Sequence, residues 1–199
     1  MRTVAIVLYK DVEVLDFAGP YEVFSTASRA RLRMDKSAEV PFVPVLVGYG
    51  EQVHARGNFC VRTHYTFGNA PKADILLVPG GVHEPAMDDD VLLDFIAARA
   101  GVSEIVASVC TGAFLLAKAG VLGACSVTTH WDDIAALRRD FPELDVRENV
   151  RWVDSGKIVT SAGISAGIDM ALHLVARLEG EELAGTTARL MEFDRRKTP

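Results

Sequence analysis

The chain has no stretch of about 18 consecutive apolar residues, the length that a membrane-spanning helix needs. Its N-terminal run, MRTVAIVLYKD, is too short for the apolar core of a signal peptide followed by a cleavage site. Lysine and arginine form no dense cluster and the formal net charge is −6, so neither nucleic acid nor an anionic membrane is expected as the main partner. These absences predict a cytoplasmic protein.

Cysteine is scarce. The three cysteines, Cys60, Cys110 and Cys125, are an odd number at unrelated spacings, which argues against a disulfide framework in a chain without an export signal. The five histidines show no metal-ligand spacing, although His54 and His64 could meet Cys60 across a hairpin. We therefore expect free thiols, no bound metal and no other cofactor.

Linkers, internal repeats and low-complexity stretches are absent as well, so we predict a single domain over residues 1–199. With 49% hydrophobic residues, a chain of this length can bury a core without disulfides or structural metals. What the sequence does contain is a series of short apolar runs, each followed by a helical pattern. This alternation predicts an α/β fold.

Three continuous apolar runs, at Thr3–Tyr9, Asp74–Pro79 and Glu104–Val109, are typical of parallel strands that are buried on both faces. Their alternation with helices predicts a doubly wound, mostly parallel sheet. Further strands are expected at Phe42–Val47, Val53–Tyr65 (a hairpin broken at Gly57 and Asn58), Ser126–Thr128 and Trp152–Thr160 (a hairpin turning at Asp154 to Gly156). Helices are expected at Tyr21–Arg29, Asp88–Ala100, Asp132–Arg139, Ile164–Leu178 and directly after Thr111.

Cys110 stands between the strand that ends at Val109 and the helix that opens after Thr111, with small residues on both sides. A nucleophile elbow requires this arrangement, because its tight turn lifts one side chain above the sheet and leaves little room for neighbouring Cβ atoms. A helix N-terminus favours a thiolate by only about 0.3–1 kcal/mol, which leaves a thiol with a pKa of about 8.5 mostly protonated at pH 7. Cys110 is therefore predicted to be a nucleophile that needs a partner; the alternative is a core cysteine.

Asp16 is the candidate partner, since it lies among apolar neighbours at the first strand-to-helix crossing. An ionised carboxylate would oppose a thiolate, so Asp16 is expected to have a raised pKa and to share its proton with Cys110. The pair would then combine a general acid with a nucleophile. The alternative role for Asp16 is a helix N-cap ahead of Pro20.

Further candidates follow the same strand ends. The backbone N–H groups of Gly80, Gly81 and Thr111 could stabilise negative charge near the sulfur, although a Gly-Gly pair after a strand is usually a simple turn. Glu22 and His130 are possible pocket residues. Helix capping is the alternative role for both, and core packing is a further one for His130.

Together, these motifs resemble the ThiJ/PfpI superfamily, within the class I glutamine amidotransferase-like fold. The resemblance covers nearly the whole chain and is strongest to isonitrile hydratases and to the N-terminal domains of AraC-type regulators. It rests on LDFAGPYEVF (residues 15–24), LLVPGG (76–81), SVCTGAFLLAKAG (108–120), TTHW (128–131) and TSAGISAGIDMAL (160–172).

The resemblance implies a flavodoxin-like α/β/α sandwich, a homodimer, and an enzyme without a cofactor whose nucleophile is Cys110 and whose acidic partner is Asp16. In isonitrile hydratases the elbow reads Cys-Thr, as Cys110 and Thr111 do here. The expected function is hydration of an isonitrile to an N-substituted formamide. Cys110 would attack the terminal carbon, Asp16 would manage the proton, and water would resolve a thioimidate.

Other branches of the superfamily fit less well. PfpI-type proteases carry a histidine directly after the nucleophile, where this chain has Thr111, and none of the five histidines begins the His-x-Glu of amidotransferases. Only a short helix and a charged tail are expected after Leu178, so the DNA-binding unit of an AraC-type regulator is not expected. The alternatives are a noncatalytic sensor whose Cys110 is oxidised, or another cofactor-free hydrolase of the amidase, protease or glyoxalase type.

Overall fold

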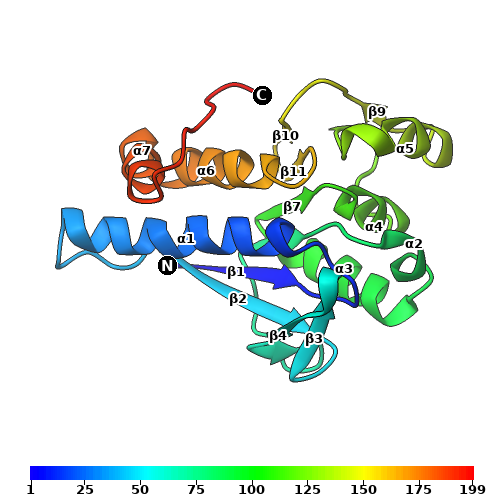
Figure 1. Ribbon diagram of the computed structural model, residues 1–199, viewed down its shortest axis with the longest axis horizontal. Helices are drawn as coiled ribbons and strands as arrows, with labels where there is room; N and C mark the ends of the chain where they lie inside the picture. Colours follow the sequence, from blue (N-terminus) through cyan, green and yellow to red (C-terminus); the bar gives the residue numbers. More distant parts are fainter.

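Seven strands form the central sheet of the computed structural model, which describes residues 1–199 (Figure 1). Their order across the sheet is β10-β11-β7-β6-β1-β2-β5, and every neighbouring pair is parallel except β10 with β11. The predicted α/β fold with a mostly parallel sheet is confirmed. The strands are β1 (Arg2–Val7), β2 (Phe42–Gly48), β5 (Tyr65–Thr66), β6 (Ile75–Val78), β7 (Ile105–Val109), β10 (Trp152–Ser155) and β11 (Ile158–Ser161).

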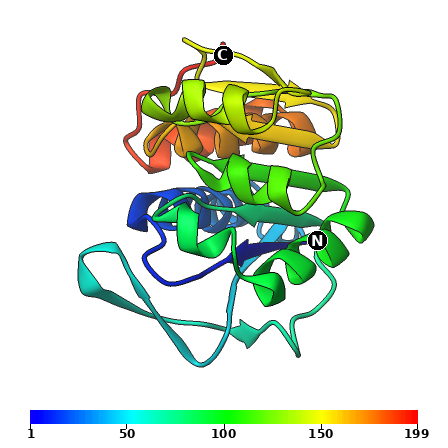
Figure 2. The same cartoon turned by 90° about the vertical axis from the view of Figure 1, so that its right-hand side faces the viewer.

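Helices cover both faces of the sheet. On one face α1, α6 and α7 pack against one another, and on the other α3 packs against α4 (Figure 2). None of the helices combines the length and the apolar character that crossing a membrane requires. The helices are α1 (Val14–Met34), α2 (His83–Ala86), α3 (Asp90–Val102), α4 (Gly112–Lys118), α5 (Ile134–Asp140), α6 (Ala166–Glu179) and α7 (Glu181–Leu190).

Two pairs of short strands lie outside the central sheet. One of them, β3 with β4, is the first of the two predicted hairpins. The second predicted hairpin is also present and consists of β10 and β11, at the edge of the central sheet. The short elements are β3 (Gln52–Ala55) with β4 (Phe59–Arg62), β8 (Ser126–Val127) with β9 (Asp145–Val146), and the 3-10 turns η1 (Arg56–Asn58) and η2 (Trp131–Asp133).

The middle of the sheet is the core. Every residue of β6 and β7 is buried, as expected for continuous apolar runs with helices on both faces. Burying one large aliphatic side chain contributes about 1.5–3 kcal/mol, so these two strands fix the positions of the loops that follow them.

The first helix differs from the prediction. We expected it to open at Pro20, but α1 begins at Val14 and contains Pro20. Proline lacks the N–H that would bond to the carbonyl of Asp16 four residues earlier, a loss that costs about 3 kcal/mol inside a helix. The helix tolerates it because α1 is 21 residues long and buries one face, including Phe17 and Phe24. Asp16 therefore lies in the first helical turn rather than ahead of the helix.

The direction of winding reverses between β1 and β6. The α1 crossover leads from β1 to β2, and the α3 crossover leads from β6 to β7 on the opposite side. In open α/β sheets, ligands bind beyond the carboxyl ends of the strands at such a reversal. Asp16, Gly80 and Cys110 follow the strands β1, β6 and β7, so the fold brings all three to this point.

Candidate active site

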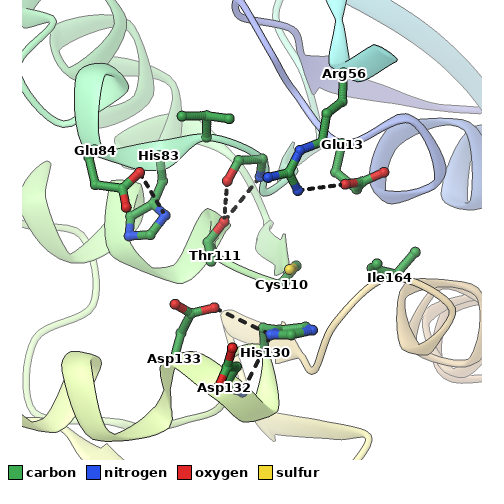
Figure 3. Close-up of a pocket in the computed structure, with 12 residues that line it drawn as sticks. Glu13, Arg56, His83, Glu84, Cys110, Thr111, His130, Asp132, Asp133 and Ile164 are labelled. Carbon is green, nitrogen blue, oxygen red and sulfur yellow. Dashed lines mark hydrogen bonds and ion pairs between the residues drawn. The ribbon is translucent and has the colours of Figure 1, made fainter.

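Cys110 occupies a strained turn between β7 and α4. Its φ angle is 57°, in the left-handed region that non-glycine residues rarely adopt. The turn is crowded, since a Cβ atom added to Gly112 would lie 2.1 Å from the carbonyl oxygen of Val78. Cys110 is 7% exposed and lines a cavity above the sheet (Figure 3). This is the geometry of a nucleophile elbow.

The Asp16 carboxyl group reaches the elbow from α1. It is fully buried, and the backbone N–H of Gly80 donates to its Oδ2 atom at 3.0 Å. Its Oδ1 atom has no hydrogen-bond partner. Burial raises the pKa of Asp16 to about 7 and the charge of Glu13 adds to the rise, while the Gly80 N–H and the Cys110 side chain lower the pKa. The raised pKa agrees in direction with the sequence argument.

The Cys110 thiol is protonated near neutral pH. Burial and then the charge of Asp16 raise its pKa to about 12, and the backbone N–H groups of Thr111 and Ile164 lower it. The sequence argument expected the Cys110 proton to be shared with Asp16, with little help from the helix dipole. Removal from water favours the protonated thiol and outweighs the N-terminus of the seven-residue helix α4. The pair therefore loses its first proton near pH 7, from Asp16, and keeps the second on the sulfur.

The two glycines after β6 hold other parts of the site in place. The Gly80 N–H donates to Asp16, and the Gly81 N–H donates to the Thr111 hydroxyl oxygen at 3.0 Å. Neither N–H is directed at the sulfur, so the predicted charge-stabilising role for Gly80 and Gly81 does not match this arrangement. The Thr111 N–H does face Cys110 and lowers its pKa, so a charge-stabilising role for this N–H stays a prediction. A Cβ atom at position 80 would lie 2.6 Å from the Thr111 nitrogen, which explains why this residue is a glycine.

Of the two possible pocket residues, His130 lies at the cavity and Glu22 does not. His130 lines the cavity with Cys110, and its Nδ1 atom accepts from the Asp132 N–H at 3.4 Å, so it also caps the turn η2. The Glu22 side chain bonds instead to Thr26 and Arg29 on the outer surface of α1. The prediction of Glu22 as a pocket residue is wrong, because α1 starts earlier than expected and places it away from the elbow.

The cavity encloses about 390 Å³ and is mainly polar. Sequence reasoning missed Glu13, which directly precedes α1, and Arg56, which the β3–β4 hairpin brings over the cavity. Their side chains form an ion pair at 3.0 Å. The backbone N–H of Arg56 donates to the backbone carbonyl of Val12 at 3.0 Å. The lining residues are Glu13, Arg56, Gly81, Val82, His83, Glu84, Cys110, Thr111, His130, Asp132, Asp133 and Ile164 (Figure 3).

The hairpin residues considered as metal ligands serve other contacts. His54 lies opposite Cys60 in the β3–β4 pairing, and its ring contacts Asn58. His64 accepts from the Leu46 N–H at 2.9 Å. No group of three or more His, Cys, Asp or Glu side chains is arranged to hold a metal ion.

A strained cysteine between a parallel strand and a helix is typical of α/β proteins that carry a nucleophile elbow, and here a buried carboxyl group lies beside it. The elbow lies at the carboxyl end of β7, next to the reversal in strand order between β1 and β6, where α/β folds place ligands. The DJ-1/PfpI family matches residues 2–177, and the chain belongs to this family.

The relatives include both a named enzyme and a named transcriptional regulator. The chain is 33% identical over 193 residues to an isonitrile hydratase of Pseudomonas putida, covering 96% of this chain and 78% of that protein. It is 31% identical over 146 residues to the HTH-type transcriptional regulator GbdR of Pseudomonas aeruginosa, covering 73% of this chain but only 40% of the regulator.

Solved structures agree on the fold. A ThiJ/PfpI family protein from Pseudomonas syringae superimposes with a TM-score of 0.84 at 26% identity, over 98% of this chain and 76% of that one. DJ-1beta of Drosophila melanogaster superimposes with a TM-score of 0.80 at 18% identity, over 96% of this chain and 98% of that one. The family and the flavodoxin-like fold implied by the sequence motifs are therefore confirmed.

Proposed function

We propose that the protein is a cofactor-independent enzyme that adds water to an isonitrile and releases an N-substituted formamide. The observation that carries the proposal is the buried Asp16 carboxyl group beside the Cys110 thiol at the elbow. The match to an isonitrile hydratase, which spans most of both chains, supports the choice of reaction. We further propose that the enzyme works as a homodimer on a small molecule.

In the first half of the reaction, the ionised Asp16 carboxylate takes the proton of the Cys110 thiol. It passes this proton to the terminal isonitrile carbon as the sulfur bonds to the same carbon. The product is the thioimidate R–N=CH–S–Cys110, and Asp16 is ionised again. The N–H groups of Thr111 and Ile164 stabilise the negative charge that develops on the sulfur.

In the second half, Asp16 takes a proton from water as the water oxygen bonds to the thioimidate carbon, and this proton passes to the nitrogen. The carbon–sulfur bond then breaks, the hydroxyl proton returns to the sulfur by way of Asp16, and R–NH–CHO leaves. The sum is one isonitrile and one water giving one formamide. Cys110 and Asp16 return to their starting states.

The alternative of a redox sensor is less well supported. Oxidation of a sensor cysteine requires an accessible thiolate, because the thiolate is the form that reacts with oxidants. Cys110 is buried, and its raised pKa keeps the thiol protonated at neutral pH. A proton-relaying carboxylate suits catalysis better than it suits oxidation.

Incubation of the purified protein with alkyl and aryl isonitriles tests the proposal. We expect formation of the corresponding formamides, followed by proton NMR, with label from H₂¹⁸O appearing in the formyl oxygen. The same isonitriles without protein provide the background rate. If no isonitrile is converted above this background, the proposed activity is wrong.

The pH dependence should report the state of Asp16. We expect kcat/KM to rise with pH through an apparent pKa of about 7, since Asp16 must be ionised to accept the Cys110 proton. Below that pH Asp16 is protonated and cannot accept the Cys110 proton; above it the rate should level off, because Cys110 keeps its proton up to about 12. A rate that falls as the pH rises through 7 would instead assign the reactive form to the neutral carboxylic acid.

A further inference from the structure

Ile164, in the turn between β11 and α6 (residues 162–165), lines the cavity together with Cys110 (Figure 3). Ile164 in this turn has a φ angle of 49°. A β-branched residue is a clear outlier in the left-handed region, so the surrounding contacts must hold it there. In this conformation the Ile164 N–H faces Cys110.

Arg151 forms hydrogen bonds with both ends of the turn. Its backbone carbonyl accepts from the Ala162 N–H at 2.8 Å, and one guanidinium nitrogen donates to the Ser165 hydroxyl oxygen at 3.4 Å. Its Nε atom donates to Asp169 Oδ2 at 2.6 Å, which anchors the guanidinium group to α6. The planar guanidinium can serve both acceptors at once, which an ammonium group cannot do in the same geometry.

Asp169 is the buried end of this linkage. Its side chain is 1% exposed, and its second oxygen accepts from the Arg196 N–H at 2.9 Å. A buried ion pair is often no more stabilising than apolar residues of similar size, so stability alone does not account for it. Asp169 also belongs to the TSAGISAGIDMAL motif, to which the catalytic proposal gives no other role.

The turn has little freedom to move without affecting the site. A Cβ atom at Gly163 would lie 2.0 Å from the ring of His130, and one at Gly167 would lie 2.9 Å from the side chain of Val109, next to Cys110. The turn therefore packs against a cavity residue, and the start of α6 that follows it packs against the strand that ends before the nucleophile. Any displacement changes the position of the Ile164 N–H relative to the sulfur.

We propose that Arg151, anchored by Asp169, is a positioning residue that holds the Ile164 N–H against Cys110. The Thr111 N–H approaches from the elbow itself, so the sulfur is held between two backbone donors from different parts of the chain. The inference rests on Cys110 as the reacting atom and not on the identity of the substrate.

The test is the rate of Cys110 alkylation by iodoacetamide between pH 8 and 10, measured by peptide mass spectrometry so that Cys60 and Cys125 are counted separately. The double variant Arg151→Met/Asp169→Leu removes both charges together and so avoids leaving a buried charge without a partner. We expect Cys110 alkylation to be about tenfold slower at each pH, because a lost donor raises the thiol pKa by about one unit. The groups that also interact with Cys110 through charge, Asp16, Asp133, Arg56 and Tyr9, are unchanged.

Two single variants make the test independent of folding. Ser165→Ala changes only an exposed side chain that caps nothing, and it should slow alkylation in the same direction by about twofold to threefold. Arg196→Pro removes the other bond to Asp169 but leaves Arg151 and Ser165 in place, so it should lower Tm without changing the alkylation profile. An unchanged profile in both the double variant and Ser165→Ala, or faster alkylation in either, would overturn the proposal. Isonitrile turnover is not needed for this result, so it stands or falls separately from the proposed function.

Discussion

Replacing Cys110 with serine is expected to lower kcat/KM for isonitrile hydration by about 10³-fold or more. The serine hydroxyl is a far weaker acid than the thiol, and the same burial that raises the pKa of Cys110 would prevent its ionisation. No other cysteine lines the cavity. The measurement is formamide production by the variant and the parent at equal concentrations, with circular dichroism to establish that the sheet is intact.

Cys60→Ser is the matched control. Cys60 is an exposed free thiol on β4, and its sulfur contacts only the Gln52 side chain among hydrogen-bonding groups. This variant should keep full activity. Residual turnover by folded Cys110→Ser within tenfold of the parent would show that the sulfur is not the nucleophile, and equal loss in Cys60→Ser would point to a general effect of thiol removal.

Replacing Asp16 with asparagine is expected to lower kcat/KM by about 10²–10⁴-fold and, at the same time, to stabilise the protein at alkaline pH. The activity is lost because an amide cannot take the Cys110 proton. The bond from the Gly80 N–H can be kept, since the asparagine carbonyl oxygen is also an acceptor. The variant therefore separates the proton relay from the structural contact.

The gain in stability follows from the raised pKa. Folding raises the pKa of Asp16 from 3.8 to about 7, so its contribution to stability is fully present below pH 3.8 and is lost as the pH rises through 7. The difference between these values corresponds to about 4 kcal/mol, an upper bound for the gain in Asp16→Asn above pH 7. Urea unfolding at pH 5 and pH 8 should show a larger gain at pH 8.

Asp94→Asn serves as the control, because Asp94 is an exposed carboxylate on α3. Its stability should follow that of the parent at both pH values. An Asp16→Asn variant that is less stable than the parent at pH 8 would mean that the buried carboxylate is not a source of destabilisation, and it would remove the basis for the predicted pH dependence of activity.

Local sequence was sufficient to predict those features that a single segment of the chain forms. A buried strand, a cysteine and a run of small residues within SVCTGA (108–113) leave few conformations other than a tight elbow, so Cys110 could be placed before its surroundings were known. Strand patterns also predicted the sheet, because β6 and β7 are apolar on both faces. Asp16 could be proposed as a partner because strands of a parallel sheet end at one edge.

Features made by contact between distant segments could not be predicted in this way. The β3–β4 hairpin was expected, but nothing in its alternating pattern shows that Arg56 lies over the cavity and pairs with Glu13. The proline signal was misleading for Glu22, since tertiary packing of α1 overrides the local cost of Pro20. The protonation of Cys110 likewise depends on burial, which a helix-dipole argument from sequence does not include.

The bond from Gly80 to Asp16 joins residues 64 positions apart, and Cys110 comes from a third segment of the chain. Parallel pairing between distant segments is slow to form, because loop closure must occur before any contact is gained. The nucleophile and its proton relay therefore come into existence only after β1, β6 and β7 have joined, whereas the β3–β4 hairpin around Cys60 can close locally. In a refolding chain, protection of Cys110 from alkylation would therefore report that β1, β6 and β7 have paired.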